Sequence, residues 1–519
     1  MSTMKTPGVY IVEKNAFPNS VVEASTAVPA FVGYTEFAKD GNKSLSNKPW
    51  KISSLAEYMQ YFGGAPQPLF SVGKAEKAAE GEDADVDPLG TASLELNGEK
   101  YTVKREGNNY NFFYQMRFFF ANGGGPCYIV SVGQGYDDDG VVEAKLIAGI
   151  DALIKEEEPT MVLVPEAIYL SSADSCANVQ VKALSHCGGE MKNRVAILDV
   201  FDGYKDTRSN NVKDFREKIG TEFLDYGAVY YPWLNTSIVP DTDINFLNFS
   251  DPDGIAKLLT DADKDGKLKE FIDVVSKANV DKYNKLVSDK DTEELPKLEL
   301  EISTAHKVLA RHSSIYSELM REMLLIINML PPSTAMAGIY TLVDGTKEVW
   351  KAPANIGVAN VISPTVSISF KDQEDLNVPM NGKAVNAIRY FVGDGIKVWG
   401  ARTLDGNSLD WRYINVRRTM IMLEESIKNA SKAYVFEPNV ANTWVTVRSM
   451  ISSFLNGIWK RGGLAGAVPE DAYSVHIGLG DTMTPEDILE GIMRVTILVA
   501  ISRPAEFIEI TFQQQMQKS

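Results

Sequence analysis

Arg194-Val-Ala-Ile-Leu-Asp-Val200 is a nearly unbroken run of β-branched and aliphatic residues, the pattern of a strand buried on both faces. A similar run, Thr160-Met-Val-Leu-Val-Pro165, precedes it, and Ala228-Val-Tyr-Tyr231 follows it. Helical patterns separate the three runs, over Cys176 to His186 and over Val212 to Leu224. Strands that alternate with helices of ten or more residues indicate a mainly parallel sheet with both faces covered. The sequence therefore predicts an α/β fold, α+β overall, for the chain.

Two segments interrupt this α/β region. Residues 71–90 are rich in Ala, Glu, Asp and Gly and predict a mobile loop, and residues 241–296 are polar and charged and predict an exposed insertion. Close to the first segment, Ala92–Leu96 and Lys100–Lys104 flank Asn97-Gly98, which predicts a β-hairpin.

Residues 298–328 predict one long amphipathic helix, because apolar side chains recur at roughly helical spacing from Ile302 to Ile326. Pro331-Pro332 follows directly, and prolines disfavour continuation of a helix. We therefore expect a domain boundary at residue 330.

The chain has 519 residues and a formal net charge of −17, which is unevenly distributed. Residues 1–330 hold 34 Lys and Arg against 50 Asp and Glu, a net of −16, whereas residues 331–519 hold 18 against 19, a net of −1. A strongly acidic chain binds phosphate backbones poorly, so no nucleic-acid partner is expected. We expect the near-neutral C-terminal third to make extensive protein contacts and the acidic remainder to face solvent.

The composition also indicates the cellular compartment in which the chain is made. Hydrophobic residues make up 44% and charged residues 23%, which is ordinary for a soluble globular protein. The longest apolar runs, such as Val495–Ile501, are too short to cross a bilayer, and no signal-peptide pattern is visible. Cys127, Cys176 and Cys187 do not form the pattern of a disulfide framework. We expect cytoplasmic synthesis and no direct membrane insertion.

Acidic side chains at the predicted strand ends are the main catalytic candidates. Glu166, Asp199 and Asp202 follow predicted parallel strands, where α/β enzymes place their sites, although carboxylates are also common there as loop caps. No dinucleotide fingerprint or P-loop is present, and the four histidines lack metal or triad spacing. An α/β hydrolase-like enzyme stays an alternative, but no catalytic residue and no cofactor are predicted.

Asp261-Ala-Asp-Lys-Asp-Gly266 is similar to the first half of an EF-hand loop, with oxygen ligands at positions 1, 3 and 5 and a glycine for the sharp turn. The bidentate glutamate expected at position 12 is replaced by Ile272, and only Glu270 lies close. A calcium site and a plain Asp/Gly surface turn are the two interpretations. Because the bidentate ligand is missing, we predict the turn and no metal site.

Both ends of the chain carry strand patterns without an evident partner. An isolated strand is rarely stable, so each must pair within its own chain or with a neighbouring subunit, and the pattern leaves both arrangements open. The residues of these two expected strands are Val9, Tyr10, Ile11 and Val12 near the N-terminus, and Phe507, Ile508, Glu509, Ile510, Thr511 and Phe512 near the C-terminus.

Seven short motifs follow one another in the C-terminal third. They are Pro331–Tyr340, Val349–Asn355, Val398–Thr403, Trp411–Thr419, Glu424–Lys428, Phe436–Asn439 and Met483–Asp487. In this order they closely resemble the sheath protein of contractile phage tails and phage-tail-like injection systems. Thr6–Tyr10 and Val28–Tyr34 resemble the same family's N-terminal signature. The resemblance covers residues 5–40 and 331–515, and the middle of the chain matches only in its α/β character.

The resemblance implies a multi-domain sheath subunit. Residues 1–27 and 505–519 would be extended N- and C-terminal linker arms, and residues 331–504 would form the sheath assembly domain. Residues 28–330 would be an inserted, outward-facing α/β portion that carries the acidic insertions near 71–90 and 241–296.

One predicted helix carries acidic and basic side chains close together. Arg417 and Arg418 face Glu424 and Glu425, with Lys428 one turn further on. Two interpretations are open: a solvated helix with internal ion pairs, or a polar surface that touches the inner tube or a neighbouring sheath subunit.

The resemblance further implies a structural, non-enzymatic role. Sheath subunits polymerise helically, in rings expected to be sixfold, around an inner tube in an extended metastable state, and contraction drives the tube through a target envelope. The implied partners are other copies of the chain, the inner tube protein, baseplate and tail-terminator or cap proteins, and a sheath-recycling ATPase. The product would be a phage tail or an injection particle. A static shell or scaffold protein assembled by strand exchange is the alternative.

Overall fold

The computed structural model describes residues 21–74, 91–96, 99–107, 110–136 and 140–511. The chain divides into two compact units, one of Ala27–Ile414 and a discontinuous one of Met1–Thr26 with Asn415–Ser519. Among the helices in the described ranges, none is both long and apolar enough to cross a membrane.

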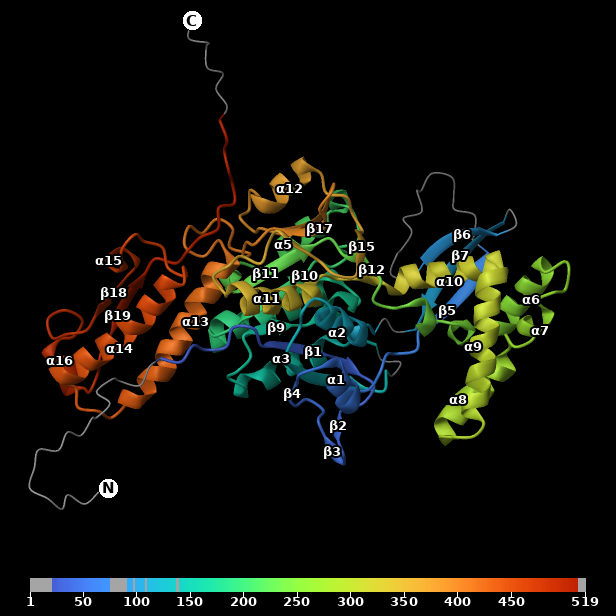
Figure 1. Ribbon diagram of the computed structural model, residues 1–519, viewed down its shortest axis with the longest axis horizontal. Coiled ribbons are helices and arrows are strands. Elements are labelled where there is room, and N and C mark those ends of the chain that lie inside the picture. Colours follow the sequence, from blue (N-terminus) through green and yellow to red (C-terminus); the bar gives the residue numbers. More distant parts are fainter. Residues whose placement is uncertain (1–20, 75–90, 97–98, 108–109, 137–139, 512–519) are drawn as a thin grey trace, which may run out of the picture. The chain divides into compact units, whose positions relative to one another are not determined.

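The Ala27–Ile414 unit is built on a nine-stranded sheet with the order β14-β17-β16-β11-β10-β9-β1-β8-β4 (Figure 1). The six strands from β16 to β8 are parallel, and β17, β14 and β4 each pair antiparallel with the strand on their inner side. The predicted strands correspond to β9, β10 and β11, which confirms the mainly parallel α/β sheet. The bounds are β1 Pro29–Thr35, β4 Trp50–Ile52, β8 Cys127–Gln134, β9 Met161–Leu163, β10 Val195–Asp199, β11 Gly227–Tyr231, β14 Ile356–Gly357, β16 Asn386–Phe391 and β17 Gly395–Trp399.

Helices cover both faces of this sheet. The neighbouring β1 residues Phe31 and Val32 point to opposite faces and are both fully buried. The ring of Phe31 contacts that of Phe119 on α2 at 4.9 Å, whereas Val32 lies against Gly149 on α3. The helices of this α/β part are α1 Leu55–Phe62, α2 Phe112–Ala121, α3 Glu143–Asp151, α4 Ala173–Ser185, α5 Asn211–Lys218, α11 Ser333–Lys347 and α12 Phe370–Asn377.

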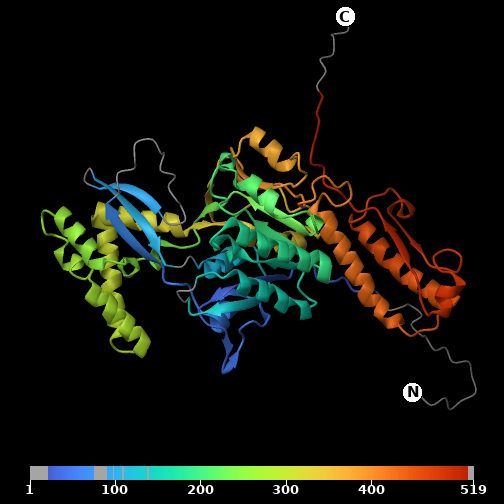
Figure 2. The same ribbon diagram turned by 180° about the vertical axis from the view of Figure 1, so that it is seen from behind.

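A smaller layer of the same unit contains a separate three-stranded sheet of β5, β7 and β6, together with helices from a distant part of the sequence. The predicted hairpin is present as β6 and β7, and residues 241–296 contain the helices α6, α7 and α8 (Figures 1 and 2). The mobile loop predicted for residues 71–90 is wrong for 71–74, which belong to β5, and residues 75–90 lie outside the described residues. The bounds are β5 Leu69–Lys74, β6 Thr91–Leu96, β7 Glu99–Glu106, α6 Pro252–Ala262, α7 Lys269–Ile272, α8 Lys277–Asp289, α9 Leu295–His312 and α10 Ser314–Ile327.

The single long helix predicted for residues 298–328 is wrong. The structure has two helices, α9 and α10, which are separated at Ser313. The Ser313 side chain accepts a hydrogen bond from the Tyr316 N–H and so begins a new helix. Both helices bury one apolar face, so the apolar spacing continues through the break. The sequence pattern therefore gives no sign that the helix ends at Ser313.

The central sheet continues past the predicted boundary at residue 330. β16 pairs in parallel with β11, and β17 and β14 extend the same sheet, so residues 331–414 belong to the Ala27–Ile414 unit. Pro331-Pro332 separates two elements of that unit, α10 and α11. Five short strands complete it: β2 Lys39–Asp40, β3 Lys43–Ser44, β12 Leu234–Thr236, β13 Met329–Leu330 and β15 Val361–Pro364.

The second unit is mainly helical and contains one small sheet. Two long helices bury an apolar face each, and β18 pairs with β19 in an antiparallel ladder. Its elements are α13 Ile414–Ser431, α14 Ala441–Lys460, α15 Pro469–Ala472, α16 Pro485–Leu489, β18 Tyr473–His476 and β19 Thr496–Val499.

The packing of α11 on α2 supplies the first prediction. A Cβ at Gly338 would lie 2.6 Å from the Phe119 carbonyl oxygen, a backbone atom that cannot move without shifting α2. Gly338→Ala should therefore destabilise the protein by about 1–3 kcal/mol. In the same helix, Gly345 is exposed with no atom within 4 Å, so Gly345→Ala should stabilise the protein by up to about 1 kcal/mol. Thermal unfolding of both variants measures the difference, and equal shifts would contradict the close approach.

Candidate functional site

The predicted C-terminal strand does not pair within the described part of its own chain. The last backbone bridge joins Leu464 to Ile501, and residues 502–511 have neither helix nor strand (Figure 1). Phe507, Ile508 and Ile510 are 75%, 79% and 69% exposed. Three large apolar side chains on one unpaired segment are costly in water, which favours pairing with another chain over an internal partner. Phe512 and the predicted strand at Val9–Val12 lie outside the described residues.

The β18–β19 sheet is a second incomplete element in the same unit. Four residue pairs join the two strands, from Tyr473 with Val499 to His476 with Thr496, and no third strand joins them in the described ranges. A two-stranded sheet is marginal by itself. It rests on α14, from which Arg448 donates a hydrogen bond to the Ile477 carbonyl. The outer edges of β18 and β19, which α14 supports, therefore offer backbone N–H and C=O groups to a further strand.

Helix α13 holds the described end of the N-terminal segment. The Arg418 guanidinium donates to the Thr26 carbonyl at 2.9 Å, and the Ala24 N–H donates to the Ser426 hydroxyl oxygen at 2.9 Å. Nearby, Glu23 pairs with Arg461 on α14 at 2.5 Å. No local sequence pattern predicts this anchoring, because it joins residues about 400 positions apart.

The five polar residues proposed on this helix separate into two groups. Arg417 and Arg418 are 6% and 4% exposed, so their side chains belong to the interior of this conformation and not to its outer surface. Glu425 pairs with Lys428 at 3.1 Å. Glu424 and Lys428 are exposed.

Glu166 occupies the point where an α/β sheet of this kind would bind a ligand. From β1 the chain continues to β8 on one side, whereas from β9 it continues to β10 on the other, so the crevice between β1 and β9 is the topological switch point. The fully buried Glu166 carboxylate accepts hydrogen bonds there from the N–H groups of Tyr34 at 2.7 Å, Asn111 at 3.1 Å and Phe112 at 3.2 Å. Asn111 and Phe112 begin α2, a helix end that favours an anion.

The other strand-end carboxylates are also engaged within the chain. The Asp199 side chain accepts from the Ser333 N–H at 2.9 Å and so joins β10 to the start of α11, while Asp202 pairs with Lys205 at 2.8 Å. Burial raises the pKa of Asp199 to about 7 despite the bond from Ser333. These contacts match the alternative interpretation of strand-end carboxylates as structural ties.

The acidic loop after α6 likewise uses its carboxylates internally. Asp263 accepts from the Leu268 N–H at 2.7 Å, and Asp265 pairs with Lys267 at 2.9 Å. No group of three or more His, Cys, Asp or Glu side chains in the described ranges is arranged to hold a metal ion. The prediction of a plain turn stays a prediction.

Comparison with known proteins relates the C-terminal unit to a family. Residues 407–515 match the family described as the phage tail sheath C-terminal domain. This chain is related to contractile tail sheath proteins. The tail sheath protein of Enterobacteria phage T4 is 25% identical over 135 residues, which is 26% of this chain. That alignment spans only 20% of the length of the T4 sheath protein.

Solved sheath structures resemble the whole chain. One is the PVC sheath complex of an extracellular contractile injection system in the contracted state, which is 25% identical with a TM-score of 0.59 and covers 99% of both chains. Another is a chain of the anti-feeding prophage baseplate, 26% identical with a TM-score of 0.57, covering 99% of this chain and 100% of that one. The sheath relationship therefore extends beyond the C-terminal match to the α/β unit.

The buried Glu166 gives a pH prediction for this sheath relative. Burial raises the pKa of Glu166 from 4.5 to about 7, although three N–H bonds act to lower it. The native state then binds more protons than the unfolded state between about pH 4.5 and 7. The contribution of Glu166 to stability is full below about pH 4.5 and falls, by on the order of 3 kcal/mol, as the pH rises to about 7.

Glu166→Gln should remove this part of the pH dependence. Denaturant unfolding of the wild type and the variant between pH 5 and 7.5, followed by tryptophan fluorescence, measures the difference in slope. Glu217→Gln, on the exposed side of α5, should keep the wild-type slope. Identical slopes for the wild type and Glu166→Gln would show that Glu166 does not take up a proton in this range.

Proposed function

We propose that this chain is a structural subunit of a contractile sheath. The observation that carries the proposal is the similarity over 99% of both chains to a sheath solved in the contracted state. In the proposed role the chain polymerises helically around an inner tube in an extended, metastable form and drives the tube through a target envelope when it contracts. The work comes from differences in subunit contacts, so the role requires no catalytic residue and no cofactor.

The proposed partners follow from this role. The first is the chain itself, in sixfold rings, and the second is an inner tube protein. A baseplate is supported by the similarity to a chain of the anti-feeding prophage baseplate, a structure described as sixfold symmetrised. Tail-terminator or cap proteins and a sheath-recycling ATPase complete the set. The particle is a phage tail or an injection system, assembled after synthesis in the cytoplasm.

Strand addition is the proposed link between subunits. The segment Phe507–Phe512 of one subunit, together with Val9–Val12 of another, adds to the open edges of a neighbour's β18–β19 sheet. Such a link consists of backbone hydrogen bonds, so its strength depends little on side-chain detail. Side chains alternate between the two faces of the added strand, and this alternation sets which face is buried. One face carries Phe507, Glu509 and Thr511, and the other carries Ile508, Ile510 and Phe512.

This link also suits a contracting assembly. A strand held on an extended segment keeps its ladder while the subunit bodies rotate, so the subunits remain connected during contraction. A preference of about 5 kcal/mol per subunit for the contracted contacts makes the change effectively one-way. The exposed Glu424 and Lys428 on α13 are proposed to contact the inner tube or a neighbouring subunit.

Truncation after Pro504 tests the link. The shortened chain should remain folded and soluble but should not form sheath tubes in negative-stain electron microscopy. Ile510→Pro should act almost as strongly, because proline removes a ladder donor. Ile510→Val is the matched control, since it keeps the N–H and the β-branched side chain, and it should form tubes.

Two outcomes decide between the proposals. Contractile tubes formed by the truncated chain would contradict the strand link. Full-length tubes of one diameter, with no contracted form, would favour a static shell and contradict the contractile role.

A further inference from the structure

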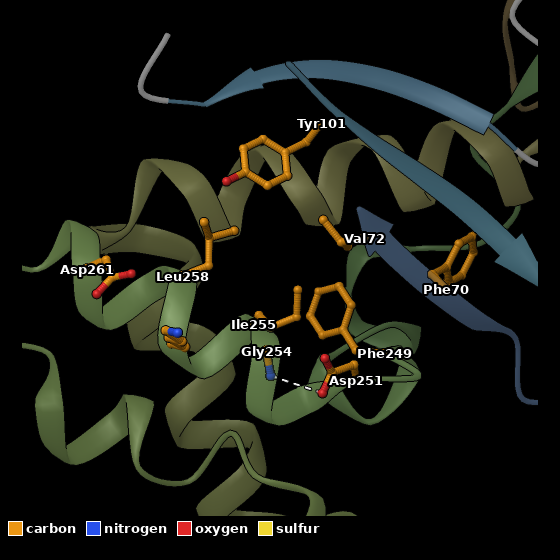
Figure 3. A pocket seen from close by; sticks show the side chains of 10 residues that line it. Phe70, Val72, Tyr101, Phe249, Asp251, Gly254, Ile255, Leu258 and Asp261 are labelled. Atoms are coloured by element: carbon orange, nitrogen blue, oxygen red, sulfur yellow. Dashed lines mark hydrogen bonds between the residues drawn. The ribbon is translucent and has the colours of Figure 1, made fainter. Parts of the chain in front are cut away.

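A cavity of about 230 Å³ lies in the smaller layer, between the β5–β7 strands and α6 (Figure 3). Its apolar wall is formed on one side by Val72 of β5 and Tyr101 of β7, and on the other by Ile255 and Leu258 of α6. Cavities that enclose drug-sized ligands measure about 300–1,000 Å³. This cavity therefore suits one side chain better than a whole small molecule.

A strand edge that is only partly paired in the described structure borders the same cavity. The order of this sheet is β5-β7-β6, so β5 is its edge strand in the described structure. The Phe70 carbonyl points away from β7, because it accepts a hydrogen bond from the Ser250 N–H at 2.9 Å, and Phe70 forms a parallel bridge with Phe249. Residues two apart on a strand point their backbone groups the same way, so the N–H and carbonyl of Val72 also face outward.

The chain itself begins a fourth strand at this edge and then leaves it. After the bridge at Phe249, Asp251 accepts from the Gly254 N–H at 3.0 Å and begins α6 (Figure 3). The position beside Val72, where the next residues of a parallel strand would lie, is therefore not taken by residues 251–262. A guest strand at that position would place one side chain over the cavity.

The charge around the cavity indicates which guest fits. The lining includes the carboxylates of Asp251 and Asp261 and the ammonium of Lys257. The Asp261 side chain has no hydrogen-bond or ion-pair partner among the residues that the structure describes. Residues 241–296 carry 14 Asp and Glu against 8 Lys and Arg, a net of −6, so the surrounding field attracts a cation.

We propose that the β5 edge and this cavity form a docking site for an extended, basic peptide segment of a partner protein. The segment adds as a strand beside Val72, places an apolar side chain between Tyr101 and Leu258, and places a lysine or arginine near Asp261. The site lies outside the unit that carries the β18–β19 sheet and goes beyond sheath assembly. It gives the acidic insertion a recruiting role.

The test uses the full chain and a fluorescent peptide, Ser-Leu-Ser-Lys-Ser-Leu-Ser-Lys, whose leucines and lysines share one strand face. Fluorescence anisotropy should report saturable binding that weakens with salt. The same peptide with glutamate in place of lysine should bind at least about fivefold more weakly, and so should a peptide with N-methylated backbone amides.

Variants of the protein locate the binding. Val72→Pro removes one outward donor from an edge strand, a position where proline is tolerated, and should weaken binding about fivefold relative to Val72→Ala. Asp261→Asn should weaken it about two- to fivefold at low salt. Asp265→Asn makes the same change of charge at a residue outside the cavity lining and should leave binding unchanged.

Each outcome decides the proposal. Selective losses at Val72 and Asp261 support it. Equal binding of the N-methylated peptide would show side-chain capture without strand addition, and equal effects of Asp261→Asn and Asp265→Asn would show attraction by net charge alone. Either result, or no saturable binding, overturns the proposal. Tube formation by the same variants is a separate readout, so failure of the docking site is distinguishable from failure of the sheath role.

Discussion

The carboxylate of Glu166 is the constraint on which the α/β unit depends. It accepts three backbone N–H groups from the end of β1 and the start of α2, while its own position follows β9. The crevice at a topological switch point is normally open to an anionic ligand. Here the buried carboxyl group of Glu166 occupies that crevice. These bonds tie β1, α2 and the end of β9 together, which suits a protein whose proposed task is mechanical and not catalytic.

The second unit has the opposite character, because its backbone is incompletely paired. A two-stranded sheet and an exposed apolar C-terminal segment each need partners, and neither provides the other's within the described chain. Unpaired edges are an aggregation hazard in a monomer, and natural proteins normally cover them. In a proposed sheath subunit the same edges become the means of assembly. Residues 415–519 hold 10 Lys and Arg against 11 Asp and Glu, a net of −1, so little like-charge repulsion opposes close packing.

Local pattern predicted some parts of the fold and misled in others. The buried runs that became β9, β10 and β11 were recognised because a strand buried on both faces is apolar throughout. The break at Ser313 was missed because two consecutive helices buried the same kind of face, so the apolar spacing continued. The domain boundary was placed at Pro331-Pro332, yet β16 returns to pair with β11. Proline reports where a helix ends, and it carries no information on which sheet a later strand joins.

The sequence by itself determined the parallel α/β sheet, the hairpin and the resemblance to sheath proteins, because these depend on residue order and short spacing. Only the tertiary structure decided where the charged residues lie. It buried Arg417 and Arg418, and it anchored residues 24–26 on α13 through partners about 400 residues away. It also brought Val72 and Asp261 to one cavity. Burial and long-range pairing depend on which distant segments come together when the chain folds, and a local pattern of side chains does not determine this.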